Sequence, residues 1–274
     1  MNIPQLEEKY ADLIKSIKIK RAIVYVVTIT VTLLVIFLTV PFRLELMGEV
    51  LTDREGLHPI LIALLVILCV LVGVFAYAFV SVSLVMTLEQ ECDPEKELIL
   101  NLKLNKRKEM YMVVVADYFF LGEYDEAMRC AMKMVGSRKD SERLMGFYHK
   151  AKCEFMTGRR ESLKMTVSHY HELLNGSDKL KLKLRPSYEK IGECLRLMVA
   201  ISENDGENIV TLSKSVTPWK NVKINEGFVN YLKGMSACII GDRDEAVFRF
   251  KSVKEDCGKT VLASLSERNL QILC

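Results

Sequence analysis

The fold is decided by a stretch at residues 116–127, which reads ADYFFLGEYDEA. Gly122 ends one helical pattern, Tyr124 follows it, and Ala127 lies five residues later inside the next helical pattern. Small residues at these places allow two antiparallel helices to approach closely. The stretch therefore predicts two helices joined by a tight turn.

The same pattern returns twice in the following part of the chain. Residues 231–246 read YLKGMSACIIGDRDEA, with the turn at Gly241 and the small residue at Ala246. A weaker copy turns at Gly158, where Leu163 stands in place of the alanine. These copies predict a recurring pair of helices.

The spacing of the copies indicates one further, degenerate turn. Gly122 and Gly158 are 36 residues apart, whereas Gly158 and Gly241 are 83 residues apart. The longer interval requires an insertion, which we expect near residues 175–186, and a fourth turn at residues 204–206.

This unit resembles the tetratricopeptide repeat, a helical pair with a small residue, an aromatic residue and a Gly-x-Tyr-x-x-Ala turn over about 34 residues. The resemblance covers residues 110–253 and is strongest at the first and last copies. Two features of the family are missing, its closing proline and its early tryptophan, and the single tryptophan, Trp219, lies in an expected linker.

The resemblance implies an all-α fold in which a TPR-like α-solenoid, capped by a helix near residues 262–273, binds a protein or peptide without catalysis. It also implies roles for particular positions. The residues expected to pack the repeats together are Gly122, Tyr124, Ala127, Gly158, Gly241 and Ala246. The residues expected to line the binding groove are Asp117, Phe120, Lys152 and Lys233.

Two apolar runs near the N-terminus are each long enough to cross a membrane as a helix. They span residues 22–40 and 60–86, and neither contains a charged residue or a histidine. A transport role is disfavoured because transport pathways place ionisable groups within their spans. The sequence predicts a transmembrane hairpin over residues 22–88, with an external loop at residues 41–59.

Basic residues predict the orientation of this hairpin. Lysines and arginines are more frequent on both flanks, residues 1–21 and 89–108, than in the loop, which holds only Arg43 and Arg54. Both termini are therefore expected in the cytoplasm, with a cytoplasmic repeat domain over residues 89–274. We expect a multi-pass plasma membrane protein, with a bacterial membrane as the favoured setting.

Catalytic and metal-binding patterns are absent from the sequence. It has no Gly-x-Ser-x-Gly, no phosphate-binding glycine loop and no His-Glu-x-x-His, so no catalytic residue and no cofactor are predicted. His149 and Cys153 share a helical face, but a metal site needs further ligands. The formal net charge of +3 gives no argument for nucleic-acid binding.

Several alternatives remain open at this point. Small and hydroxyl residues, such as Thr28 and Gly73, could pack the hairpin or join two copies as a homodimer. The basic amphipathic segment 1–21 could lie on the membrane or dock on the repeats, and residues 179–185 could contact lipid headgroups or form a solvated connector. The interpretation favoured here is a membrane-anchored scaffold or adaptor; the alternative is a membrane-bound enzyme or small-ligand sensor.

Overall fold

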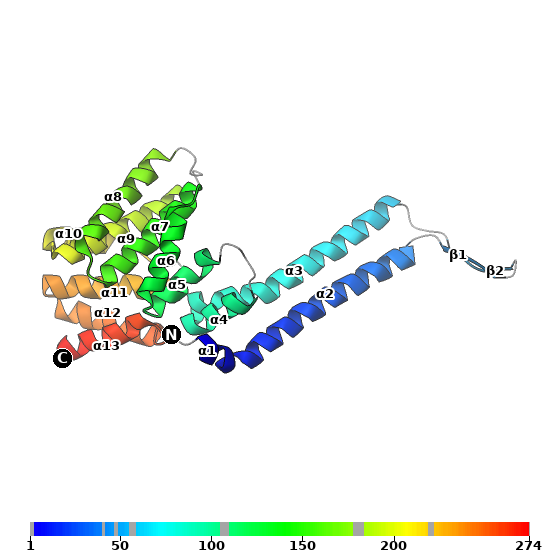
Figure 1. Ribbon diagram of the computed structural model, residues 1–274, viewed down its shortest axis with the longest axis horizontal. Coiled ribbons are helices and arrows are strands. Elements are labelled where there is room, and N and C mark those ends of the chain that lie inside the picture. Colours follow the sequence, from blue (N-terminus) through cyan, green and yellow to red (C-terminus); the bar gives the residue numbers. More distant parts are fainter. Residues whose placement is uncertain are drawn as a thin grey trace. The chain divides into compact units, whose positions relative to one another are not determined.

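The computed structural model describes residues 3–39, 42–46, 49–54, 59–104, 110–177, 184–218 and 222–273. Apart from one two-stranded hairpin, every regular element among these residues is a helix, which confirms the all-α prediction (Figure 1). The helices are α1 (Ile3–Lys9), α2 (Ala11–Thr39), α3 (Pro59–Glu91), α4 (Pro94–Leu104), α5 (Tyr111–Phe120), α6 (Tyr124–Val135), α7 (Asp140–Met156), α8 (Arg160–Gly176), α9 (Arg185–Glu203), α10 (Gly206–Ser215), α11 (Lys223–Ile240), α12 (Arg243–Asp256) and α13 (Val261–Leu273), and the strands are β1 (Phe42–Leu46) and β2 (Glu49–Arg54).

The chain divides into two compact units. The hairpin unit comprises Tyr10–Val85, and the globular unit comprises Met1–Lys9 together with Met86–Cys274. The N-terminal helix α1 therefore belongs to the same unit as the C-terminal helices, although the whole hairpin unit separates them in the sequence. Trp219 and residues 178–183, which include most of the segment 179–185 considered above for lipid contact, lie outside the described residues.

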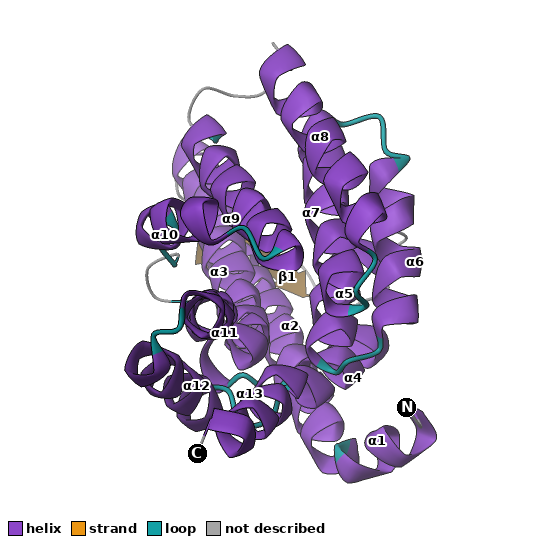
Figure 2. Ribbon diagram, turned by 90° about the vertical axis from the view of Figure 1, so that its left-hand side faces the viewer, coloured by secondary structure: helices purple, strands orange, loops and turns teal. Residues whose placement is uncertain are grey.

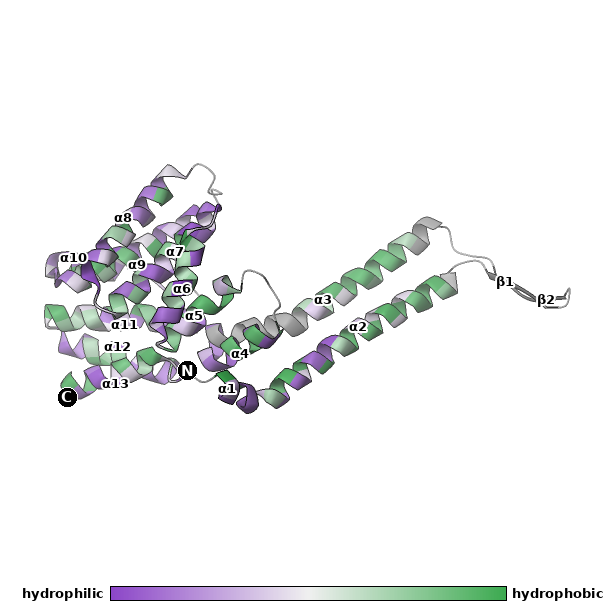
Figure 3. Ribbon diagram, in the orientation of Figure 1, coloured by the Kyte–Doolittle hydropathy of each residue, from purple (hydrophilic) through white to green (hydrophobic). Residues whose placement is uncertain are grey.

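The hairpin unit contains the apolar helices. Among the described residues, one helix segment, Ala11–Phe37, is long and apolar enough to cross a membrane, with a mean hydropathy of 2.0, and Ala63–Ala78 is a shorter apolar stretch of α3. Figure 3 shows that both helices are hydrophobic along most of their described length, whereas the helices of the globular unit have mixed faces. The strands β1 and β2 pair antiparallel, with Phe42 opposite Arg54.

A glycine brings α2 and α3 together at one point. A β-carbon added to Gly73 would lie 2.2 Å from Cγ2 of Thr28, so only glycine leaves room for this threonine. The hydroxyls of Thr28 and Thr32 donate to the carbonyl oxygens of Val24 and Thr28, each at 2.7 Å, so both threonine donors are satisfied within α2. Arg21 lies over the ring of Tyr77, 5.4 Å from its centroid.

The helix α1 packs on α4 within the globular unit. Leu6 is buried there, the ammonium of Lys9 lies 2.5 Å from Glu95 Oε2, and Lys103 forms an ion pair with Glu7. Exposed ion pairs contribute little, so the burial of Leu6 accounts for most of this attachment.

Four turns of one geometry organise the rest of the globular unit. Among the described residues, Gly122, Gly158 and Gly241 have backbone φ angles of +80°, +69° and +81°, and Asn204 has +55°. The residue after each turn donates its N–H to the carbonyl oxygen five residues earlier; for Glu123 and Tyr118 this distance is 2.9 Å. Such a left-handed residue ends a helix and favours glycine or asparagine because a β-carbon is strained there.

The position five residues after each turn is fully buried. It is occupied by Ala127, Leu163, Ile209 and Ala246, each with 0% exposure. The turns therefore join four equivalent helix pairs among the described residues: α5 and α6, α7 and α8, α9 and α10, and α11 and α12. The long interval after Gly158 contains the turn at Asn204, and its extra length follows from α8 and the connection to α9.

The first helices of these pairs meet in the centre of the globular unit. Helix α7 contacts both α5 and α9, and α9 contacts α11 (Figure 2). The rings of Phe119 in α5 and Phe228 in α11 lie edge to face, with centroids 5.7 Å apart. Because α11 thereby reaches α5, the first helices close on one another, and α13 packs on α11 and α12.

Candidate functional site

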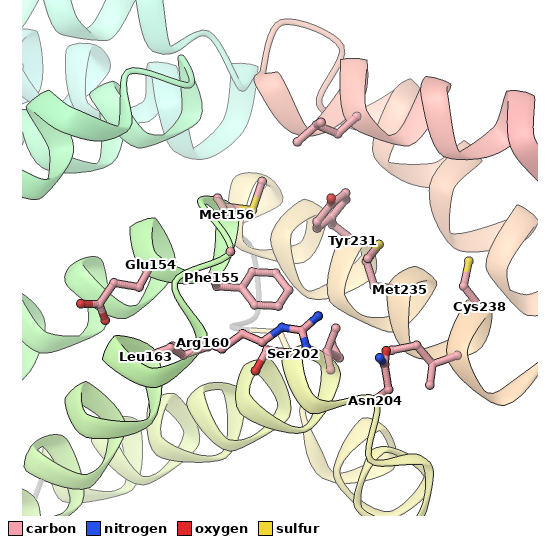
Figure 4. A pocket seen from close by; sticks show the side chains of 14 residues that line it. Glu154, Phe155, Met156, Arg160, Leu163, Ser202, Asn204, Tyr231, Met235 and Cys238 are labelled. Atoms are coloured by element: carbon pink, nitrogen blue, oxygen red, sulfur yellow. The ribbon is translucent and has the colours of Figure 1, made fainter.

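A cavity of about 400 Å³ opens at the ends of the first helices, beside two of the turns. Its wall comes from α7, α8, α9, α11 and α13, and the side chains that line it are shown in Figure 4. The apolar part of the wall includes Phe155, Met156, Leu163, Ile201, Tyr231, Met235, Ile239 and Leu265. We call this cavity the turn pocket.

The turns create this pocket by ending the helices that surround it. Gly158 and Asn204, two of the left-handed turn residues, lie on its wall. A β-carbon added to Gly158 would meet no atom within 4 Å, so the left-handed φ angle, rather than crowding, favours glycine there. The hydroxyl of Thr157 donates to the carbonyl oxygen of Cys153 at 2.7 Å and satisfies one acceptor at the end of α7.

One cation projects into the turn pocket. Figure 4 shows the side chain of Arg160 extending from the start of α8 toward Ser202 and Asn204. Arg160 is exposed, and the described residues provide no carboxylate as an ion-pair partner for its guanidinium. The pocket therefore combines an apolar wall with an available positive charge.

The carboxylate of Glu154, also on the wall, is already engaged. Its Oε1 atom accepts from Lys150 Nζ at 2.7 Å and from the hydroxyl of Ser162. Its Oε2 atom is buried without a hydrogen-bond partner among the described residues, and Figure 4 shows the carboxylate directed away from the centre of the pocket. Glu154 thus joins α7 to α8 and does not face a ligand.

A lysine is enclosed by aromatic rings where the first helices meet. The side chain of Lys152 is 2% exposed, and its Nζ lies 3.9 Å from the ring centroid of Phe119, 4.4 Å from that of Phe120, 4.5 Å from that of Phe228 and 5.2 Å from that of Tyr148. Burial lowers the pKa of Lys152 to about 7. Aromatic faces attract the ammonium and oppose this shift. We call this arrangement the lysine cage.

Two more titratable groups are buried near the first helices. Desolvation raises the pKa of Asp117 well above its usual range, and the nearby charge of Glu97 acts in the same direction. Asn101 donates to Asp117 Oδ2 at 3.4 Å. Burial and the charge of Lys152 lower the pKa of His149 to about 3, so this imidazole is neutral at physiological pH.

The residues predicted to line a groove lie in the interior instead. Asp117, Phe120 and Lys152 are buried, and Lys233 is half-buried with a pKa lowered by burial. The physical reason is that side chains of α5, α7 and α11 fill the space between these helices. The ring of Phe228 packs on that of Phe119, and Lys152 lies against both rings. A partner at the surface does not reach these three buried side chains.

The residues predicted to pack the repeats occupy the turns and the positions after them. Gly122, Gly158 and Gly241 are the left-handed turn residues, and Ala127 and Ala246 are fully buried. The ring of Tyr124 lies 5.8 Å from that of Phe119, and desolvation raises the pKa of its phenol to about 12.

The described residues contain no group of three or more histidines, cysteines or carboxylates placed to bind a metal ion. The buried histidine and the cysteine four residues later thus belong to a packed core rather than to a recognisable ligand set in this part of the chain.

Sequence reasoning missed the turn pocket. Its apolar residues, among them Met235 and Tyr231, resemble ordinary core residues, and only their nearness to the helix ends separates them from the core. The pair of turns at Gly158 and Asn204 was the only signal in the sequence for this pocket. Side chains close to a turn lie at the edge of the repeats, where a pocket can open to the surface. Comparisons of the chain with protein-family models, curated proteins and solved structures find no match.

Proposed function

We propose that this protein is a membrane-anchored adaptor whose TPR-like α-solenoid binds a protein or peptide at the turn pocket. The observation that carries the proposal is an apolar cavity of about 400 Å³ with Arg160 at its wall, a cation that has no ion-pair partner among the described residues. Concave apolar sites with a few placed polar groups are typical binding sites.

The four equivalent turns support the repeat architecture. Each has a left-handed residue, an N–H bond to the carbonyl oxygen five residues earlier and a fully buried residue five positions later. The interval of 36 residues between the first two turns is close to the period of about 34 residues in this repeat family. The solenoid would contain four pairs followed by α13.

The position of α1 supports a two-span topology. Residues Met1–Lys9 belong to the globular unit, which otherwise begins at Met86. A chain that leaves this unit, enters the membrane through α2 and returns through α3 must cross an even number of times. Together with the basic flanks, this supports a topology in which both termini are cytoplasmic and the β1–β2 hairpin is external.

Packing within one hairpin explains the small residues of the two spans. Gly73 is already filled by the side chain of Thr28 from α2 of the same chain. A homodimer through the same faces would have to replace this contact, so we propose that the spans serve chiefly as an anchor.

The chemistry of the turn pocket indicates the kind of peptide that it would accept. A large apolar side chain would be buried against Phe155, Tyr231 and Met235, which contributes about 1.5 to 3 kcal/mol. A neighbouring carboxylate on the peptide would pair with Arg160, whose planar guanidinium suits such a group. The mostly apolar wall favours this ligand over the small polar substrate of an enzyme or sensor.

Photo-crosslinking in the native membrane tests the proposal. A photoreactive amino acid replaces Met235 in the pocket or, as a control, the exposed Lys251 of α12 in the full chain. We expect a specific crosslinked partner at the pocket position alone, and its loss in the Arg160→Glu variant. Equal crosslinking at both positions, or a partner that is retained in Arg160→Glu, would contradict a binding site at the turn pocket.

A further inference from the structure

Two cysteines that are far apart in the sequence touch in the interior of the globular unit. Cys92 directly follows α3, Cys257 directly follows α12, and their Sγ atoms are 3.3 Å apart. Their exposures are 1% and 0%. Because a disulfide joins sulfurs at about 2.05 Å, the two atoms need to approach by only about 1.3 Å.

We propose that Cys92 and Cys257 form a redox-active pair in which hydrogen peroxide oxidises the two thiols to an internal disulfide. This inference is independent of the turn pocket and of the adaptor function, since neither cysteine lines that pocket.

The backbone holds Cys92 in an unusual conformation. Its φ angle is +49°, in the left-handed region that residues with a β-carbon rarely adopt. Such a conformation persists where surrounding contacts determine it. These contacts come from the next residue, Asp93, whose Oδ1 accepts from the N–H of Lys96 at 3.1 Å and whose Oδ2 lies 2.6 Å from Lys259 Nζ. The second contact ties the segment of Cys92 directly to that of Cys257.

The position of Cys257 is fixed from three sides. Its N–H donates to the carbonyl oxygen of Val253 at 2.9 Å, and its own carbonyl oxygen accepts from the hydroxyl of Thr260 at 2.8 Å. On the third side, a β-carbon added to Gly227 of α11 would lie 2.4 Å from Cys257 Sγ. The glycine therefore leaves the space that this sulfur occupies beside Cys92.

The environment assigns different roles to the two sulfurs. The hydrogen bond from Cys257 lowers the pKa of Cys92, and the charge of Lys223 acts in the same direction. The same hydrogen bond and burial raise the pKa of Cys257. Because the thiolate is the nucleophile, Cys92 would react first and Cys257 would act as the resolving thiol.

The reaction balances with one peroxide molecule. The thiolate of Cys92 attacks one oxygen, the O–O bond breaks, and the departing hydroxide takes a proton to form water, which leaves a sulfenic acid. The sulfur of Cys257 then attacks the sulfur of Cys92, the S–O bond breaks, and hydroxide leaves with the Cys257 proton as a second water. Peroxide gains the two electrons that the thiols lose.

Burial determines which reagents can reach the pair. Hydrogen peroxide is small, whereas bulky thiols and protein reductants require access to a sulfur that is exposed. The disulfide would join the residue that follows α3 to the connection between α12 and α13, 165 positions further along the chain. A crosslink over so long a loop restricts the unfolded chain, so the oxidised globular unit should resist unfolding.

Peptide mapping of the full chain in detergent tests this proposal. The protein is treated with hydrogen peroxide, alkylated after denaturation and digested. We expect one crosslinked peptide that contains Cys92 and Cys257 and weighs two hydrogen atoms less than its two unoxidised parts together. We also expect a higher urea midpoint, which is lost when dithiothreitol is present in the urea that exposes the disulfide. Cys238, which is exposed, reports whether the peroxide dose was sufficient.

Two kinds of variant control the experiment. Cys92→Ser should abolish the crosslink, whereas Cys194→Ser, at another buried cysteine, should retain it. Gly227→Ala should lower the yield because its methyl group displaces the sulfur of Cys257. If Cys238 is oxidised in the wild type while Cys92 and Cys257 are both recovered fully alkylated, the pair is not redox-active and the proposal fails, whether or not the variants fold.

Discussion

Replacing Lys152 by methionine should stabilise the globular unit, because it removes a buried charge while keeping a side chain of similar length. The lysine is 2% exposed, and burial lowers its pKa from 10.5 to about 7. This change corresponds to about 5 kcal/mol of cost for the charged form. Four aromatic rings surround the ammonium, and at about 0.5 kcal/mol each they recover about 2 kcal/mol.

The expected gain in the free energy of unfolding for Lys152→Met is therefore about 3 kcal/mol below pH 7, or about 6 to 12 °C in melting temperature. The gain must depend on pH. The unfolded chain keeps this proton up to about pH 10.5, whereas the folded chain releases it at a lower pH because burial lowers the pKa of Lys152. The unfolded state binds more protons in this interval, so wild-type stability rises with pH and the advantage of methionine shrinks.

Urea unfolding of the full chain in detergent, followed by circular dichroism between pH 6 and 9, measures this difference. The upper limit avoids the range in which thiols such as Cys194, whose pKa burial raises to about 12, begin to affect stability in the opposite direction. The exposed Lys251→Met provides the control, because the same chemical change in solvent should alter stability by less than about 0.5 kcal/mol at every pH. A destabilised Lys152→Met variant, or a gain that is constant across this range, would refute the desolvation argument.

Three further outcomes follow from the topology and the packing. In intact cells, Asp53→Cys should react with a membrane-impermeant maleimide, whereas Lys106→Cys should react only after permeabilisation; the reverse pattern would invert the proposed topology. Ala246→Leu overfills a fully buried position and should cost about 1 to 3 kcal/mol, unlike Lys251→Leu on the exposed face of the same helix, so an unchanged melting curve would contradict the register of the repeats. Gly73→Val should push away the facing threonine of the other apolar helix and lower the thermal stability of the full chain in detergent, and an unaffected protein would show that this close approach is dispensable.

The turns could be predicted from the sequence because their cause is local. A left-handed residue followed by a helix start needs only a glycine or an asparagine in the right place, and Gly122, Gly158 and Gly241 are such residues. Asn204 takes the same conformation, although the expected degenerate turn was recognisable mainly from the Asn-Asp-Gly composition. Local chemistry also explains the start of α4, where Asp93 caps the helix and Pro94 is its first residue.

The burial of the residues expected to line the groove could not be predicted, because it depends on a contact between distant parts of the chain. Phe119 and Phe228 are 109 residues apart, and their ring contact closes the first helices on one another. Charged residues are usually exposed, so Asp117 and Lys152 looked like surface residues on an open face. No local pattern indicated that a ring from α11 would pack against Lys152. The same closure buries these groups and raises the free energy of their charged forms.

Two cations near one turn show how this closure separates stability from binding. Lys152 lies before the turn at Gly158, and Arg160 follows it. From sequence position alone, either cation is equally suited to contact a ligand. The aromatic rings enclose Lys152, and its removal should therefore change the free energy of unfolding without affecting a surface partner. Arg160 is exposed beside an apolar cavity, and its removal should leave stability within about 0.5 kcal/mol while it weakens the binding of an acidic peptide. If these two effects were exchanged, the binding surface would lie between the first helices after all, and the contact of α11 with α5 would have to open for a partner to bind.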